Sequence, residues 1–174
     1  QSHKDHAENK FIMGHQFFTS MIYTPLLHLP LFPRLYSKNT ESKIDMAKEL
    51  IDNLVFEAKI MIDAVLMDSW YSDKKIIKKC ITKDIKVVCG IKTNRNISLN
   101  RDEWLSLSSF SKEQTQSCFE NYLIDDRKYM IASFRVKLNG IPKVKMLISK
   151  EYFEDKKEWS NNFHLISTSR DDTP

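Results

Sequence analysis

The residue best placed to do chemistry is Asp68, which directly follows the apolar run at residues 64–67. A short apolar run after the polar end of a helix predicts a buried strand. Open α/β sheets place ligand and metal chemistry at the carboxyl ends of their strands. We therefore expect Asp68 to be the leading functional residue. The competing interpretation is that Asp68 only caps a helix beginning near Asp73, since Asp favours helix starts.

Polar and basic residues follow the next predicted strand, at residues 85–92. Lys92, Asn94 and Arg95 are expected at the same edge of the sheet as Asp68. Side chains of these types position nucleic acid by contacting its phosphates. We therefore expect them to bind DNA, and the alternative is ordinary loop chemistry around Asn94.

A short basic helix is predicted between these two strands, over residues 73–80. Lys74 and Lys75 belong to it, and each phosphate that a lysine neutralises adds a salt-sensitive increment to DNA affinity. The alternative is a solvated helix face without a partner. The aromatic pair Trp70 and Tyr71 favours packing at the junction between strand and helix over stacking on bases.

The elements that must position these residues follow from hydrophobic periodicity. From Thr40 to Ile62 the apolar residues repeat with a helical period, and Thr40 or Ser42 is suited to be the N-cap. This helix leads into the strand that ends at Asp68. Helix, strand, helix and strand in succession predict an α/β core with at least one parallel strand pair.

The rest of the chain reads as mainly β structure. Residues 10–18 predict a strand bent at Gly14, and residues 23–36 an extended neighbour. Alternating segments on both sides of Asn139-Gly140 predict a hairpin, and residues 163–168 a last strand. Residues 98–116 are ambiguous.

Composition narrows the classes of function. The net charge of +4 permits a polyanionic partner without demanding one. Three cysteines without a CxxC pair argue against a disulfide framework and a zinc knuckle, and favour a reducing cytoplasm. Three glycines give no phosphate-binding loop, so no nucleotide cofactor is expected. The apolar stretch at residues 21–35 is broken by prolines, His28 and Arg34, so we expect no membrane span.

Four stretches together carry a family resemblance. They are the histidine-containing run at residues 3–16 with Gly14-His15, the strand and acid at residues 65–71, the basic strand end at residues 90–95, and residues 165–168. In this order and spacing the sequence resembles the DDE transposases of bacterial and archaeal insertion sequences, in the branch with a β-rich insertion. The resemblance covers nearly the whole chain.

The resemblance implies an α/β fold with an incomplete ribonuclease-H-like core and a mainly β insertion. Residues 1–96 would form the first part of the core, residues 97–160 the insertion, and residues 161–174 the last core strand. The implied activity is nicking and strand transfer at transposon ends, using Mg²⁺ or Mn²⁺ held by three carboxylates. Asp68 matches the second of these acids and is the expected catalytic residue and metal ligand.

The resemblance also implies that the chain is a fragment truncated at both ends. The family's first acid is expected before residue 1 and its last after residue 174, since Asp171 and Asp172 lie in a predicted loop. We therefore expect no catalysis by this chain alone, and metal binding only in the complete enzyme. Expected partners are transposon-end DNA and a second copy or an intact transposase. The alternatives are a non-catalytic DNA-binding remnant and a structural α/β domain.

Overall fold

The computed structural model describes residues 2–5, 10–37, 39–99 and 103–169 of the chain. The chain divides into two compact units, Gln1–Lys59 and Ile60–Pro174. The second unit contains Asp68 and the other predicted site residues. The boundaries expected after residues 96 and 160 fall within this second unit, and Asp171 and Asp172 lie outside the described residues.

The described residues of the first unit form three antiparallel strand pairs. They are β1 (Ser2–Asp5) with β2 (Lys10–Met13), β3 (Gln16–Phe18) with β6 (Arg34–Tyr36), and β4 (Met21–Tyr23) with β5 (His28–Pro30). The prediction of one bent strand over residues 10–18 was wrong. The chain leaves the strand conformation at Gly14 and His15, and the two halves pair with different strands.

Helix α1 (Lys43–Asp52) completes the first unit and continues as a π-helical turn at Asn53–Glu57. The Ser42 hydroxyl accepts a hydrogen bond from the Asp45 N–H, so Ser42 is the N-cap. The prediction that the helix extends to Ile62 was wrong. The chain leaves the helix at Lys59, whose φ of 53° is left-handed and cannot continue it.

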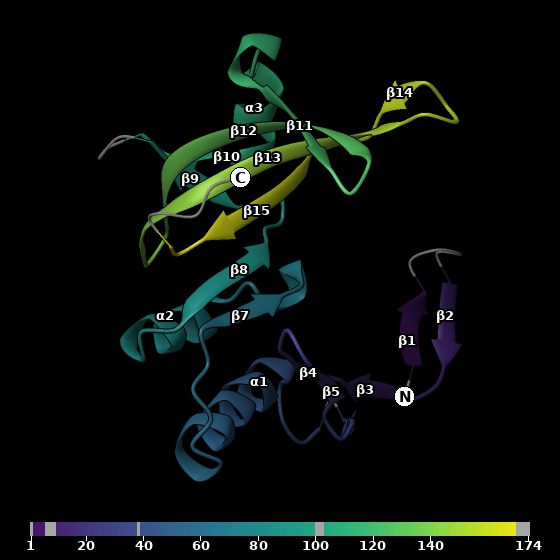
Figure 1. Ribbon diagram of the computed structural model, residues 1–174. Helices are drawn as coiled ribbons and strands as arrows, with labels where there is room; N and C mark the ends of the chain where they lie inside the picture. Colours follow the sequence, from purple (N-terminus) through teal and green to yellow (C-terminus); the bar gives the residue numbers. More distant parts are fainter. Residues whose placement is uncertain (1, 6–9, 38, 100–102, 170–174) are drawn as a thin grey trace. The chain divides into compact units, whose positions relative to one another are not determined.

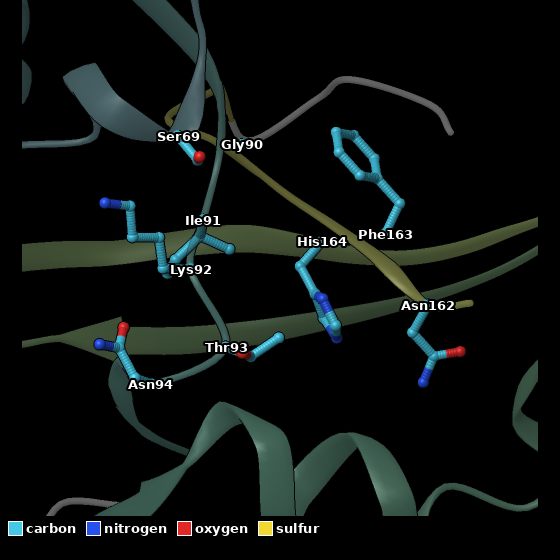
Figure 2. A pocket seen from close by; sticks show the side chains of 9 residues that line it. All are labelled: Ser69, Gly90, Ile91, Lys92, Thr93, Asn94, Asn162, Phe163 and His164. Carbon is cyan, nitrogen blue, oxygen red and sulfur yellow. The ribbon is translucent and has the colours of Figure 1, made fainter. Parts of the chain in front are cut away.

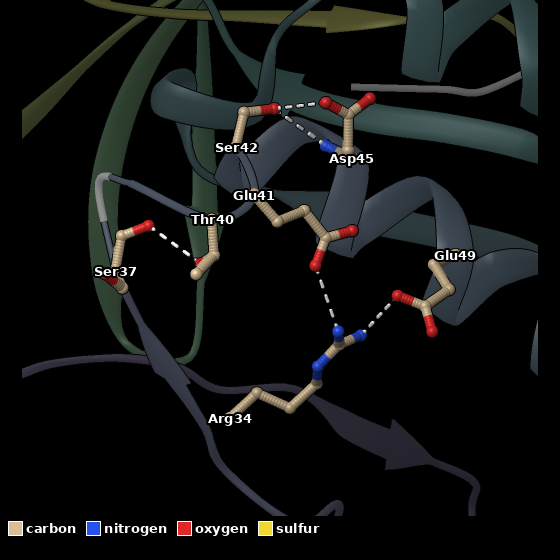
Figure 3. A network of polar contacts seen from close by, with 7 residues as sticks. All are labelled: Arg34, Ser37, Thr40, Glu41, Ser42, Asp45 and Glu49. Atoms are coloured by element: carbon tan, nitrogen blue, oxygen red, sulfur yellow. Dashed lines mark hydrogen bonds and ion pairs between the residues drawn. The ribbon is translucent and has the colours of Figure 1, made fainter.

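Arg34 links strand β6 to the start of α1 (Figure 3). Its guanidinium donates to Glu41 at 3.0 Å and to Glu49 at 2.8 Å. Glu41 lies just before the N-cap of α1 and Glu49 lies within the helix, so one arginine links the strand to both the start and the body of α1. Because solvent screens ion pairs as exposed as these, they orient the strand more than they stabilise it.

The second unit is built on one mixed sheet (Figure 1). Its main path runs β10–β9–β12–β13–β15–β8–β7, with β11 beside β12 and β14 beside β13. Only β7 and β8 are parallel among the strand pairs that the structure describes. The strands are β7 (Ala64–Met67), β8 (Lys86–Gly90), β9 (Asn96–Ser98), β10 (Leu105–Ser106), β11 (Glu120–Ile124), β12 (Arg127–Leu138), β13 (Ile141–Phe153), β14 (Glu158–Trp159) and β15 (Phe163–Ser167).

Short helices occupy the connections of this unit. A 3₁₀ turn, η2 (Ser69–Tyr71), follows β7, and α2 (Lys74–Thr82) leads to β8. The Asp73 carboxylate accepts from the Lys75 N–H at 2.7 Å and caps α2. Helix α3 (Leu107–Glu113) and the 3₁₀ turn η3 (Gln116–Cys118) precede β11. The ambiguous segment at residues 98–116 thus contains β10 and α3.

The core of the second unit lies on one face of the sheet. Strand register places Cys89, Ile166 and Met146 side by side, and all three are almost completely buried. Helix α3 packs on this face, where the Phe110 ring meets the Phe134 ring edge-on at 4.9 Å. Helix α2 contributes a fully buried pair, Ile76 and Ile77, and contacts β8.

The predicted hairpin is confirmed as β12 and β13. Gly140 has a φ of 74°, the left-handed conformation that glycine adopts without strain. The register shifts between Val136 and Leu138, so a bulge lies next to the turn. The last predicted strand is confirmed as β15, which lies between β13 and β8.

The predicted α/β class is also confirmed, since helices pack on a mixed sheet with one parallel pair. None of the helices in the described part of the chain has the length and hydropathy that a membrane span requires.

Ile77→Ala tests the packing of α2. The side chain is fully buried, so its truncation should lower the free energy of unfolding by about 2–5 kcal/mol. Tryptophan fluorescence during urea denaturation measures this for the second unit, which contains all three tryptophans. Lys78→Ala, at the exposed neighbouring position, is the control and should change the free energy of unfolding by less than about 0.5 kcal/mol. Equal losses for the two variants would contradict this packing.

Candidate functional site

The carboxyl ends of β7 and β8 form one edge of the sheet, as the sequence predicted. The two strands run in parallel with Met67 opposite Cys89, so Asp68 and the segment after Gly90 leave the sheet side by side. Asp68, Lys92, Asn94 and Arg95 therefore share this edge, which we call the β7–β8 edge.

A close approach between Ser69 and Gly90 holds the β7–β8 edge together. A Cβ atom at position 90 would lie 3.2 Å from both the Cβ and the backbone N of Ser69. Such contacts are tighter than side chains normally make, so glycine allows the turn after Asp68 to lie directly against β8. The thiol of Cys89 adds a hydrogen bond to the Ser72 hydroxyl at 3.6 Å.

Asp68 is exposed and caps the 3₁₀ turn η2. Its Oδ1 accepts a hydrogen bond from the Trp70 N–H, at the long distance of 3.4 Å. The helix α2, which Asp68 was expected to cap in the competing interpretation, is capped by Asp73 instead. Burial and the nearby charge of Asp68 raise the pKa of the Tyr71 hydroxyl, so this hydroxyl stays protonated at neutral pH.

Lys92 lies over the indole ring of Trp70. Its Nζ is 4.0 Å from the ring centroid, well within the range of a cation–π interaction. Trp70 is 65% exposed, so the prediction that it packs as a wedge at the strand–helix junction was wrong. The half-buried Tyr71 fits that description better.

Arg95 connects the loop after β8 to the residues before α2. Its Nη2 donates to the Ser72 backbone carbonyl at 3.0 Å. The backbone also turns here, since the Arg95 N–H donates to the Lys92 carbonyl at 3.1 Å. Arg95 therefore has a structural role at the β7–β8 edge.

A cavity of about 490 Å³ opens at the β7–β8 edge (Figure 2). Figure 2 shows Lys92 and Asn94 on one side of the chain segment after Gly90, with His164 and Asn162 on the other. Most of the residues that line the cavity are polar, and the full set is Ser69, Gly90, Ile91, Lys92, Thr93, Asn94, Asn162, Phe163 and His164. The cavity thus offers a cation, hydroxyl groups and amides to a ligand.

A buried polar network lies on the His164 side of this cavity. The Ser111 hydroxyl of α3 is 3.0 Å from His164 Nε2 and receives a hydrogen bond from the Asn162 amide. Asn162 Oδ1 is buried and has no hydrogen-bond partner in the part of the chain that the structure describes. Burial lowers the pKa of His164, so its imidazole is neutral at pH 7. The network fixes β15 to α3 beneath the cavity.

The structure separates the predicted DNA-binding residues into two groups. Lys92 and Asn94 line the cavity, and Arg95 adjoins it. Lys74 and Lys75 are exposed on the first turn of α2 and are not among the lining residues. The Lys74 side chain lies beside the hairpin turn at Gly140 instead.

The metal ligands that the family resemblance implies are present only in part. Asp68 offers one carboxylate, whereas Mg²⁺ takes near-octahedral oxygen coordination. Among the described residues, no group of three His, Cys, Asp or Glu side chains could hold a metal ion. These residues therefore do not form a magnesium site without further ligands.

Several site residues were not singled out from the sequence. Ser69 and Thr93 are the chain neighbours of the predicted residues Asp68 and Lys92. Their positions just after predicted strands could have marked them as site residues. Ser111 and His164 are 53 positions apart, and no spacing rule joins a residue of a short helix to one of a distant strand.

His164 should make stability depend on pH. In the unfolded chain its pKa is about 6.5, and in the folded protein burial lowers it. As pH falls below about 6.5 the unfolded state therefore takes up a proton that the folded state does not, and the free energy of unfolding decreases. Urea denaturation at pH 7.5 and at pH 5 measures this effect. Between these two pH values the free energy of unfolding should fall less for His164→Gln than for the wild type. The exposed His28→Gln serves as the control, and an unchanged pH dependence in His164→Gln would contradict the assignment.

Comparison of the sequence with protein-family models gives no match, and comparison with curated proteins gives no significant match.

Proposed function

We propose that this chain is part of a DDE transposase and binds DNA at the β7–β8 edge. The observation that carries the proposal is the position of Asp68 and Lys92 at the carboxyl ends of two adjacent parallel strands. Ligands of open α/β sheets bind outside these strand ends. The family assignment itself is supported by the order and spacing of the four matching sequence stretches.

The ribonuclease-H-like fold is part of the same proposal. What supports it is the succession of β7, α2 and β8, with an acid at the end of β7, followed by a long β-rich segment. The strands of that segment extend the sheet through β15, which pairs with β8 in antiparallel fashion.

DNA binding is supported by the chemistry of the cavity rim. Lys92 brings a positive charge, and Thr93 and Asn94 bring hydrogen-bond donors to the same loop. Phosphate oxygens accept from all three kinds of group, and such contacts set the position of DNA without reading its sequence. Arg95 holds the loop in place through Ser72.

Lys92→Ala tests the DNA contact. Loss of one phosphate contact should weaken duplex binding and reduce the slope of log K against log salt by about one. Fluorescence anisotropy with a labelled duplex over a range of salt concentrations measures both effects. Lys156→Ala, in the turn between β13 and β14, is the matched control and should leave the slope unchanged. The same slope in Lys92→Ala would place the DNA elsewhere.

Asp68 is proposed to supply one metal ligand in the complete transposase. Since no group of three His, Cys, Asp or Glu side chains among the described residues could hold a metal ion, we do not expect DNA cleavage by this chain alone. The competing role is that of a helix cap only, and the hydrogen bond from the Trp70 N–H to Asp68 favours it. Asn is as good an N-cap as Asp but carries no charge. Asp68→Asn therefore separates the two roles.

Asp68→Asn should reveal the charge of Asp68 at the DNA edge. Without divalent cations the Asp68 carboxylate repels phosphates, so the variant should bind DNA at least as tightly as the wild type. With Mn²⁺ present, the phosphate oxygens of bound DNA supply the further hard ligands that the chain lacks, so the wild type should gain affinity and Asp68→Asn should not. Anisotropy titrations with EDTA and with Mn²⁺ measure this reversal. An identical response of both proteins to Mn²⁺ would leave Asp68 with the capping role alone, and Asp68→Ala would then cost about 1 kcal/mol of stability.

A further inference from the structure

We propose that the indole of Trp70 stacks on an unpaired base, so that the β7–β8 edge prefers single-stranded DNA to duplex DNA. This inference rests on the proposed DNA-binding function and adds the class of DNA that the edge accepts. Its basis is the position of an exposed tryptophan between the acid at the end of β7 and the polar cavity beside it.

The exposure of Trp70 distinguishes it from the other two tryptophans. Trp70 is 65% exposed, against 48% for Trp104 and 39% for Trp159. Trp159 packs against the Tyr152 ring at 5.2 Å. Trp70 instead projects from a three-residue turn whose backbone is fixed by the Asp68 cap and by the contact of Ser69 with Gly90. An indole on a fixed backbone can stack on a ligand with little loss of conformational entropy.

The Lys92 ammonium covers one face of the Trp70 ring, so a base stacks on the opposite face, with Lys92 next to it to meet its phosphate. Lys92 is 4.0 Å from the Trp70 ring and also lines the cavity. Proteins that bind single strands combine a cation that follows the backbone with aromatic rings on which bases stack. Trp70 and Lys92 supply both parts within one contact.

The cavity next to the Trp70 turn offers hydrogen-bonding side chains to the edge of a base stacked on Trp70. Ser69, the chain neighbour of Trp70, lines it together with Thr93 and Asn94. These side chains offer donors and acceptors to the base edge. In a duplex that edge is paired and both base faces are covered by neighbours, so neither contact is possible until the base leaves the stack. The combination therefore selects unpaired bases.

The test compares a 12-nucleotide single strand with the duplex of the same sequence, using fluorescence anisotropy in EDTA at low salt. Trp70→Ala should weaken single-strand binding about 5- to 100-fold, the usual effect of losing one stacked base, and duplex binding less than about 2-fold. Trp70→Phe retains an aromatic face and should lose much less. Trp104→Ala is the matched control and should bind both DNAs like the wild type. Thermal denaturation establishes that each variant is folded.

The outcomes separate this inference from the function on which it rests. An equal loss on both DNAs would mean that Trp70 only positions Lys92, and it would overturn the stacking role. Single-strand binding that is unaffected by Trp70→Ala would overturn it as well. If the wild type binds neither DNA at low salt, the DNA-binding function fails and the inference fails with it. A second measurement uses the double variant Trp104→Phe and Trp159→Phe, in which single-stranded DNA should quench the remaining Trp70 fluorescence.

Discussion

The contact between Ser69 and Gly90 is the constraint on which the β7–β8 edge depends. Two parallel strands bring their ends to one edge, but side chains normally keep the following loops apart. With no Cβ at position 90, the turn after Asp68 lies against the end of β8. Beside that contact Trp70 lies under Lys92, and Ser69 lines the cavity. The arrangement of side chains at this edge thus depends on glycine at position 90.

Near this contact, buried residues hold the helices on the sheet, and exposed residues are left to contact a ligand. The fully buried Ile76 and Ile77 fix α2 on the sheet, and the Ser111–His164 pair joins α3 to β15. Lys92 and Trp70 are exposed and extend from short segments between packed elements, Trp70 between β7 and α2 and Lys92 between β8 and β9. Binding sites on loops gain precision when a packed scaffold positions the loops. The β7–β8 edge has that arrangement.

Local patterns predicted much of this fold, and contacts between distant residues account for the rest. The apolar runs before Asp68 and Lys92 were enough to predict a parallel pair, and Asn139-Gly140 to predict the hairpin. The helical segment was predicted to extend to Ile62 because the apolar period continues past Lys59, but the left-handed backbone at Lys59 does not allow a helix to continue. Within the site, Asp68 and Lys92 followed from strand ends. The network of His164 and the exposure of Trp70 depend on packing, which a hydrophobic pattern does not specify.

The three cysteines differ in accessibility, and this gives the protein an internal chemical probe. Cys80 of α2 and Cys89 of β8 are buried, and burial raises the pKa of Cys80 to about 11 and also raises the pKa of Cys89. Cys118, on the turn η3, is exposed. Because the thiolate is the reactive form, an alkylating reagent should modify Cys118 in the native protein and reach the other two when α2 detaches. The number of modified thiols therefore reports the opening of the core directly beneath the β7–β8 edge, without any engineered label.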